Sequence, residues 1–113
     1  MTAYKRGDVI LVTFVFADET GVKLRPAVIV SSEAYHSGRD EVIIEAISSR
    51  TDRILLGDHL IKDWQRAGLL FPSVATGAVR TMKQNMIARK LGSMPSPEMK
   101  AIDDNIRLAL DLS

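Results

Sequence analysis

The chain has 113 residues, of which 46% are apolar and 26% charged, and this size and composition predict one globular domain over residues 1–113. Fifteen Lys and Arg residues nearly balance fourteen Asp and Glu residues, so the net charge of +1 does not by itself indicate a nucleic-acid-binding protein. The absence of cysteine excludes disulfides, thiolate metal ligands and a cysteine nucleophile.

The first half of the chain contains three predicted strands. Residues 8–16, 25–31 and 41–47 are rich in β-branched and aromatic side chains, which favour strands. Residues 17–24 form a predicted polar loop and residues 32–40 a predicted turn region, since both contain glycine and charged side chains. Because the strands are almost continuously apolar, we expect both faces of their sheet to be covered.

The middle of the chain is predicted to change from loop to helix and back to strand. Residues 48–57 are polar and then apolar, which indicates a loop with room for a short strand. Residues 58–67 are predicted to form one to three helical turns, with Asp58 as the N-cap and Gly68 just past the end. Residues 73–82 and 86–92 are predicted as two further strands.

The last segment has the clearest helical pattern. Ser96 is the predicted N-cap and Pro97 the first helical residue, where its missing N–H is harmless. Apolar side chains follow at helical spacing: Met99, Ile102, Ile106, Ala109 and Leu110. Five or more short strands followed by a helix predict a mainly β, α+β fold, and a small closed barrel would hide the strand edges.

The usual catalytic side chains are few. His36 and His59 are the only histidines, and neither has a second ligand at metal-binding spacing, so we predict structural or surface roles for both and no metal site. The pair Asp103–Asp104 is predicted to face water on the last helix. No apolar run approaches the ~18–20 residues that span a bilayer, and no signal-peptide pattern is present, so we expect a cytoplasmic protein without membrane contact.

Arginine and hydroxyl groups are the remaining candidates for chemistry. Arg25 precedes Pro26, which holds Arg25 extended and suits its planar guanidinium to a bidentate grip on phosphate. Ser48, Ser49 and Arg50 follow the third strand and could bind a second phosphate. The plainer interpretations are an arginine at a strand end and an ordinary turn. Residues 76–94 carry four basic side chains and no acid, which indicates either a local anion site or a solvated basic segment.

Five segments, in order, resemble the PemK/MazF toxins of toxin–antitoxin systems. Residues 5–12 (KRGDVILV) resemble the opening "RGD" strand of the family, and residues 24–31 (LRPAVIVS) closely resemble its "RPA(V/L)V(V/I)S" strand. Residues 45–50 (EAISSR), 77–81 (GAVRT) and 90–94 (KLGSM) fall where the family has "PIT(S/A)Q/K", "DQIRT" and "KIG(R/K)L". The order of the segments is that of the family over essentially the whole chain.

This resemblance implies an SH3-like β-barrel with a C-terminal helix and a homodimer. It implies a metal-independent, cofactor-free endoribonuclease that cuts single-stranded RNA and leaves 2′,3′-cyclic phosphate and 5′-hydroxyl ends. A cognate antitoxin protein would neutralise it. The family's catalytic arginine and threonine carry over to Arg25 and Ser48, while the expected RNA contacts are Lys23, Ser49, Arg50, Arg80 and, in the first loop, Glu19.

Two departures leave alternatives open. Gly77 stands where the family has an acid, and Ser48 lacks the methyl group of threonine, which would restrict its rotamers. The chain could therefore be a non-catalytic RNA- or protein-binding growth regulator, such as a gyrase-poison-like protein or an inactive homologue, or a structural interaction domain. The aromatic side chains available for stacking on bases are Tyr4, Phe14, Phe16, Tyr35, Trp64 and Phe71, and we expect at least half of them in the core.

Overall fold

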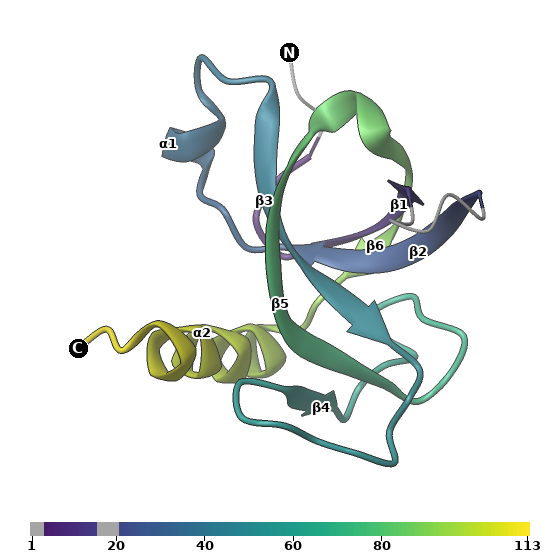
Figure 1. The fold of residues 1–113 in the computed structure, drawn as a ribbon, viewed down its shortest axis with the longest axis vertical. Coiled ribbons are helices and arrows are strands. Elements are labelled where there is room, and N and C mark those ends of the chain that lie inside the picture. Colours follow the sequence, from purple (N-terminus) through teal and green to yellow (C-terminus); the bar gives the residue numbers. More distant parts are fainter. Residues whose placement is uncertain (1–3, 16–20) are drawn as a thin grey trace.

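The structure is a computed structural model and describes residues 4–15 and 21–113. Within these residues the elements are β1 (Asp8–Val15), β2 (Val22–Ile29), α1 (Glu33–His36), β3 (Glu41–Ser48), β4 (His59–Ile61), β5 (Ser73–Lys83), the 3-10 helix η1 (Gln84–Met86), β6 (Ile87–Ser93) and α2 (Ser96–Leu110). The strands form one antiparallel sheet in the order β4-β5-β3-β2-β1-β6 (Figure 1).

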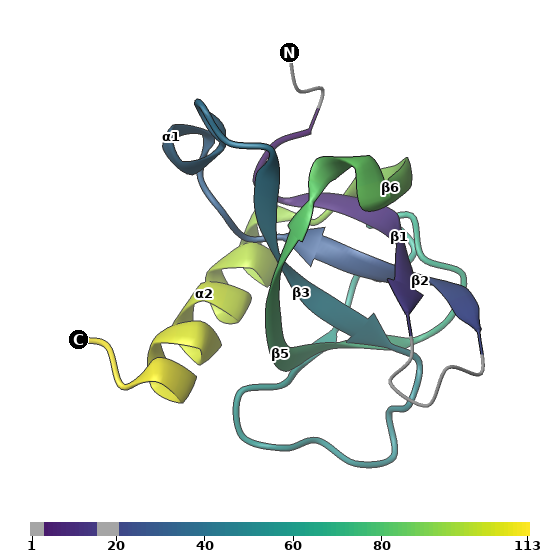
Figure 2. The ribbon, with the colours of Figure 1, turned by 45° about the horizontal axis from the view of Figure 1, so that its top comes forward.

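The sheet is strongly curled, as the two views show (Figures 1 and 2). Its hydrogen-bonded ladder nevertheless stays open, because β4 and β6 are its two edges in the described part of the chain. Register shifts in the β1–β6 and β3–β5 ladders mark irregularities of the kind that bend strands. The predicted mainly β fold with a C-terminal helix is confirmed, whereas full closure by hydrogen bonds is not found.

Packing between the two edges takes the place of a closed ladder. Gly68, in the turn after β4, lies so close to β6 that a Cβ on it would sit 2.3 Å from the carbonyl oxygen of Leu91. A Cβ on Gly92 of β6 would sit 2.4 Å from the carbonyl oxygen of Ala67. Only glycine allows two backbones to approach this closely, so these two glycines let the turn cover the β6 edge.

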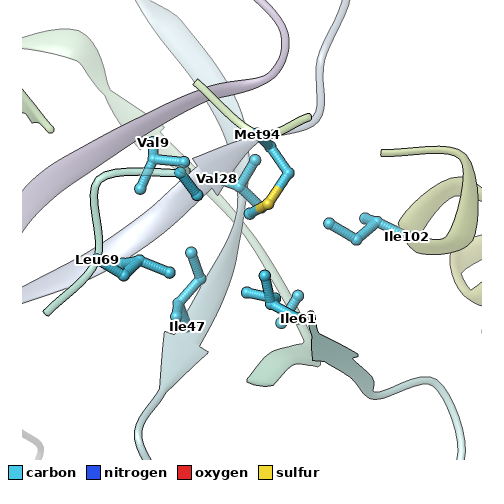
Figure 3. Packing of buried hydrophobic residues seen from close by; sticks show 9 residues of the cluster. Val9, Val28, Ile47, Ile61, Leu69, Met94 and Ile102 are labelled. Atoms are coloured by element: carbon cyan, nitrogen blue, oxygen red, sulfur yellow. The ribbon is translucent and has the colours of Figure 1, made fainter. Parts of the chain in front are cut away.

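Buried side chains pack on both faces of the sheet, as predicted from the continuous apolar strands. One cluster lies between the sheet and α2 and includes Val9, Val28, Ile47, Ile61, Leu69, Met94 and Ile102 (Figure 3). The other is formed by Ile10, Val12, Ala27, Ile29, Val42, Ile44 and Ile87. The strands β1, β2 and β3 contribute to both clusters, which makes them the centre of the fold.

The predicted helix at residues 58–67 is wrong. His59–Ile61 forms β4 and pairs with β5, with Ile61 buried and Leu60 exposed in the alternation of a strand. Helix-like hydrogen bonds in this segment occur only in the turn after β4, where the N–H of Leu69 bonds the carbonyl of Trp64 at 3.0 Å. Gly68 ends this turn with φ of +88°, the conformation expected just past a helix.

Three other boundaries differ from the sequence prediction. β2 begins at Val22 inside the predicted loop 17–24, because it pairs with β1 in a hairpin. Residues 33–36 of the predicted turn region form α1. Helix α2 begins at Ser96 with Pro95 as the N-cap, so the predicted side-chain cap at Ser96 is wrong, and Leu110 at its other end is exposed.

Helix α2 is tied to the sheet by charged groups as well as by its apolar face. The Glu98 carboxylate accepts the N–H of Asp63 at 2.7 Å and lies 2.5 Å from His59 Nε2. Burial raises the pKa of Glu98, but these hydrogen bonds outweigh it and hold the pKa below its ordinary value. Asp103 is half-buried and bonds Arg6, so only Asp104 of the predicted water-facing pair is exposed to solvent. None of the helices in the described ranges is long and apolar enough to cross a membrane.

Glu45 is a carboxylate inside the core. It faces the cluster beneath α2, between Val28 and Val79 of the neighbouring strands, and is 1% exposed. Neither of its oxygens has a hydrogen-bond partner within the described residues. Burial, followed by the charges of Asp58 and Asp103, raises the pKa of Glu45 from 4.5 to about 8, so Glu45 is largely protonated at neutral pH.

We expect Glu45→Gln to remove a pH dependence of stability. The folded state keeps a proton that the unfolded chain loses between about pH 4.5 and 8, so the free energy of unfolding of the parent falls as pH rises through this window. Urea denaturation from pH 5 to 8.5 would show this slope in the parent and a flatter profile in Glu45→Gln. Glu41→Gln, on the same strand beside Arg39, is the control and should keep the slope. An unchanged slope in Glu45→Gln would contradict this assignment.

Replacing Gly68 by alanine should destabilise the fold more than replacing Gly38. Both glycines have positive φ, so both substitutions carry a backbone cost of about 1 kcal/mol, but Gly38 has open space around its Cβ position. Only Gly68→Ala forces a methyl group against the Leu91 carbonyl. Urea midpoints compare the two variants, and equal midpoints would show that the turn can move away from β6.

Candidate functional site

Arg25 lies inside β2 rather than at the loop boundary expected from the sequence. It is the fourth residue of the strand, pairs with Val12 of β1, and is exposed. Pro26 follows it within the ladder and restricts its backbone to the extended region. The strand thus holds the base of the Arg25 side chain on a rigid element.

Ser48 is brought beside Arg25 by the register of β2 and β3. The last described pair of this ladder joins Ala27 and Ala46, and Arg25 and Ser48 each lie two residues further along their strands. Side chains two residues apart share a face of a strand. Arg25 and Ser48 therefore lie on the same face at matching positions, although 23 residues separate them in the sequence.

A groove of about 890 Å³ runs past this pair. Its polar lining consists of Arg25, Ser48, Ser49, Arg50, Ser73, Arg89 and Lys90. Its apolar lining includes Leu11, Phe14, Leu24, Leu69, Leu70, Phe71 and Leu91. None of the described residues that line the groove carries a carboxylate, so its potential favours anions.

The hydroxyl of Ser48 is oriented by the turn that follows it. Ser48 Oγ accepts the backbone N–H of Arg50 at 3.1 Å, which fixes the oxygen and leaves its own proton to donate. This hydrogen bond supplies some of the order that the missing threonine methyl would provide. The Arg50 guanidinium bonds Asp52 at 3.3 Å and thereby holds the pKa of Asp52 below its ordinary value.

Only some of the other predicted RNA contacts lie in the groove with Arg25 and Ser48. Ser49 and Arg50 line the groove, but Lys23 and Arg80 do not. Arg80 extends from β5 with its guanidinium carbon 5.0 Å from the centre of the Phe14 ring, a cation–π contact that reaches the groove only through that ring. Glu19 lies outside the described residues.

Two groove cations, Arg89 and Lys90 of β6, were not singled out individually by the sequence. Both belong to the acid-free segment 76–94, so the signal was the segment's charge, and the fold decided which of its residues face the groove. Lys90 Nζ lies 3.2 Å from the buried Asp8 carboxylate. Arg89 has no ion-pair partner within the described residues, which leaves its charge for a ligand.

A carboxylate from elsewhere in the chain occupies the surroundings of Gly77. Asp58 Oδ1 accepts the N–H of Gly77 at 2.8 Å, and Oδ2 accepts the N–H of Leu55 at 2.9 Å. Both oxygens are therefore used to pin the loop after β3 against β5. The predicted N-cap role of Asp58 is replaced by this tertiary role.

Both histidines have structural partners, as predicted. His36 is buried and its Nε2 lies 2.5 Å from Ser31 Oγ, while His59 contacts Glu98. No cluster of three metal-ligating side chains occurs among the residues that the structure describes. A larger hollow of about 1050 Å³ lies beside α1 and η1, but it mixes acids with cations and contains none of the predicted site residues.

Comparison with known proteins shows the family of the chain. The chain matches the family described as PemK-like, MazF-like toxin of type II toxin–antitoxin system over residues 5–110. It therefore belongs to this toxin family. None of the curated proteins matches the chain.

Solved structures of low sequence identity share the fold. An endoribonuclease in complex with its cognate antitoxin from a Mycobacterial species is 21% identical over 98% of each chain, with a TM-score of 0.77. The Mycobacterium tuberculosis toxin MazF-mt6 is also 21% identical, over 94% of this chain and 98% of its own, with a TM-score of 0.77. A MazE–MazF structure from Deinococcus radiodurans is 15% identical over 99% and 100% of the two chains, with a TM-score of 0.81.

Proposed function

We propose that this toxin is an endoribonuclease that cleaves single-stranded RNA in the groove beside Arg25 and Ser48. The observation that carries the proposal is the convergence of a guanidinium and an oriented hydroxyl, from separate strands, in a groove without described acids. Membership of the toxin family and the endoribonuclease named among the structural neighbours support it.

The proposed reaction is an attack by the RNA on itself. The ribose 2′-hydroxyl loses its proton to water and attacks the adjacent phosphorus, and the bond to the 5′-oxygen breaks as that oxygen gains a proton from water. The products are a 2′,3′-cyclic phosphate and a 5′-hydroxyl. Negative charge accumulates on the non-bridging phosphate oxygens in the transition state, which is where fixed donors lower the barrier.

Arg25 and Ser48 have different roles in this scheme. Arg25 supplies a fixed positive charge and two donors to the phosphate, without a metal ion or cofactor. An arginine side chain keeps its proton at neutral pH, so Arg25 is assigned to charge stabilisation and not to proton transfer. Ser48 donates its remaining proton to a phosphate oxygen.

The remaining cations bind the RNA backbone. Arg50 and Arg89 lie in the groove and are assigned to phosphates that flank the scissile one, with Ser49 as a further donor. Lys23, Arg80 and Glu19 are kept as outer contacts of a longer RNA. Such contacts make binding depend on salt concentration.

Membership of the toxin family implies two kinds of protein partner, an antitoxin and a second copy of the toxin, and a cellular location. We propose that a cognate antitoxin covers the groove, that two copies of the toxin form a homodimer, and that the toxin acts on mRNA in the cytoplasm. Light scattering of the purified protein measures its mass, and a monomer at micromolar concentration would contradict the dimer.

Cleavage of a mixed single-stranded RNA in the presence of EDTA tests the proposed reaction. Discrete fragments with 2′,3′-cyclic phosphate ends are expected, and Arg25→Ala and Ser48→Ala should each lower kcat by about 10²–10³-fold, as removal of one preorganised donor does. Arg39→Ala, in the segment between α1 and β3 and outside the groove, is the matched control and should cleave like the parent. Ser48→Thr should retain activity because it keeps the hydroxyl.

The alternative is a non-catalytic binding protein, which the glycine at position 77 favours. Binding to a 2′-deoxy oligonucleotide separates the two functions, because this probe lacks the attacking hydroxyl. The enzyme proposal expects Arg25→Ala to lose rate while it keeps most of its affinity. Intact RNA with a folded, antitoxin-free parent protein would support the binding protein instead.

A further inference from the structure

The segment Leu69–Ser73 forms one wall of the groove and exposes two large apolar side chains. Leu70 is 82% exposed and Phe71 is 63% exposed. Both line the groove that also contains Arg25, Arg50 and Arg89. Exposed side chains of this size contribute little to the core. Their position beside the cations indicates a surface that binds a ligand.

The backbone that carries Phe71 is fixed from both sides. Leu69 is buried and its N–H bonds the Trp64 carbonyl at 3.0 Å. Ser73 is buried too, and its hydroxyl donates to the Phe71 carbonyl at 2.7 Å. Pro72 restricts Phe71 to extended conformations. The ring is therefore presented by a rigid segment and not by a loose loop.

We propose that Phe71 is a stacking platform for an unpaired base next to the phosphate held by Arg25. This inference rests on the proposed RNA cleavage and assigns a substrate-positioning residue to it. An aromatic ring beside a row of cations matches the two parts of a single strand, because the backbone follows the positive charges and a base stacks on the ring. Bases in a duplex are not available for such stacking.

The composition of the groove favours this occupant over a purely apolar one. Leu24, also exposed, lies in the same groove, but the Arg89 cation, which has no ion-pair partner among the described residues, would lose its hydration under an apolar partner without gaining a counter-charge. A polyanion with flat apolar bases satisfies both the cations and the ring. Phe71 acts by positioning the RNA and does not touch the reacting atoms.

The test uses a non-cleavable probe so that binding is measured apart from rate. The probe is a fluorescent 12-nucleotide 2′-deoxy strand with the sequence around the cleavage site mapped on RNA. Phe71→Ala should bind it about 5- to 150-fold more weakly, the usual loss for one stacked base. Phe71→Trp should bind like the parent, and Phe71→Leu should be weak although it keeps apolar area. Tyr35→Leu, which removes an aromatic ring in α1 outside the groove, should have no effect.

Removal of bases from the probe tests the same contact without changing the protein. An abasic substitution is made at each of the three positions on either side of the mapped site. At one of these positions the abasic substitution should weaken binding to the parent. The same substitution should have little further effect on binding to Phe71→Ala, because both changes remove the same stacking contact. The single-turnover rate of RNA cleavage by Phe71→Ala should return to the rate of the parent when the enzyme is saturating, because the substitution weakens binding and not the chemical step.

The outcomes separate this inference from the proposed function. If the parent cleaves RNA but Phe71→Ala binds the probe like the parent, or no abasic position couples to Phe71, the stacking platform is wrong and the cleavage proposal stands. If the folded, antitoxin-free parent cleaves no RNA, so that no site can be mapped, and also binds no mixed-sequence 2′-deoxy strand, both proposals are wrong. Loss of binding in Phe71→Trp as well as in Phe71→Ala would also overturn the inference, since a larger ring stacks at least as well.

Discussion

The constraint on which this structure depends is the burial of both faces of the β1–β2–β3 ladder. Val28 of β2 packs in the cluster beneath α2, and its neighbours Ala27 and Ile29 pack in the other cluster. A shift of one residue in the register would turn every one of these side chains to the opposite face. Core packing therefore selects a single register, and that register brings Arg25 beside Ser48.

The open ladder accounts for the position of the groove. The turn that contains Gly68 packs its backbone against the β6 edge at Gly92, and the groove lies along this junction. One wall comes from the segment after the Gly68 turn, and the opposite cations come from β2 and β6. A site built across such a junction combines rigid strands with a long exposed lining, which suits an extended ligand.

Acidic side chains are kept out of the described groove lining and used elsewhere in the fold. Glu98 and Asp103 hold α2 to the sheet, and Asp58 holds the loop after β3 against Gly77. Glu45 is buried without a partner, and protonation lets it remain there at neutral pH. Position 77 carries no acid of its own, but the carboxylate of Asp58 lies beside it and accepts its backbone N–H.

The sequence alone determined the strands with strong β-branched patterns, the C-terminal helix and the toxin family, and it predicted Arg25 and Ser48 as site residues. These signals are local: strand and helix periods, and short motifs in a fixed order. Only the tertiary structure decided that residues 59–61 pair as a strand, that Asp58 binds Gly77, and that Arg89 and Phe71 face the groove while Lys23 and Arg80 do not. Those outcomes depend on contacts between segments far apart in the chain, where the energy of burial and pairing exceeds the weak local preference of any single residue.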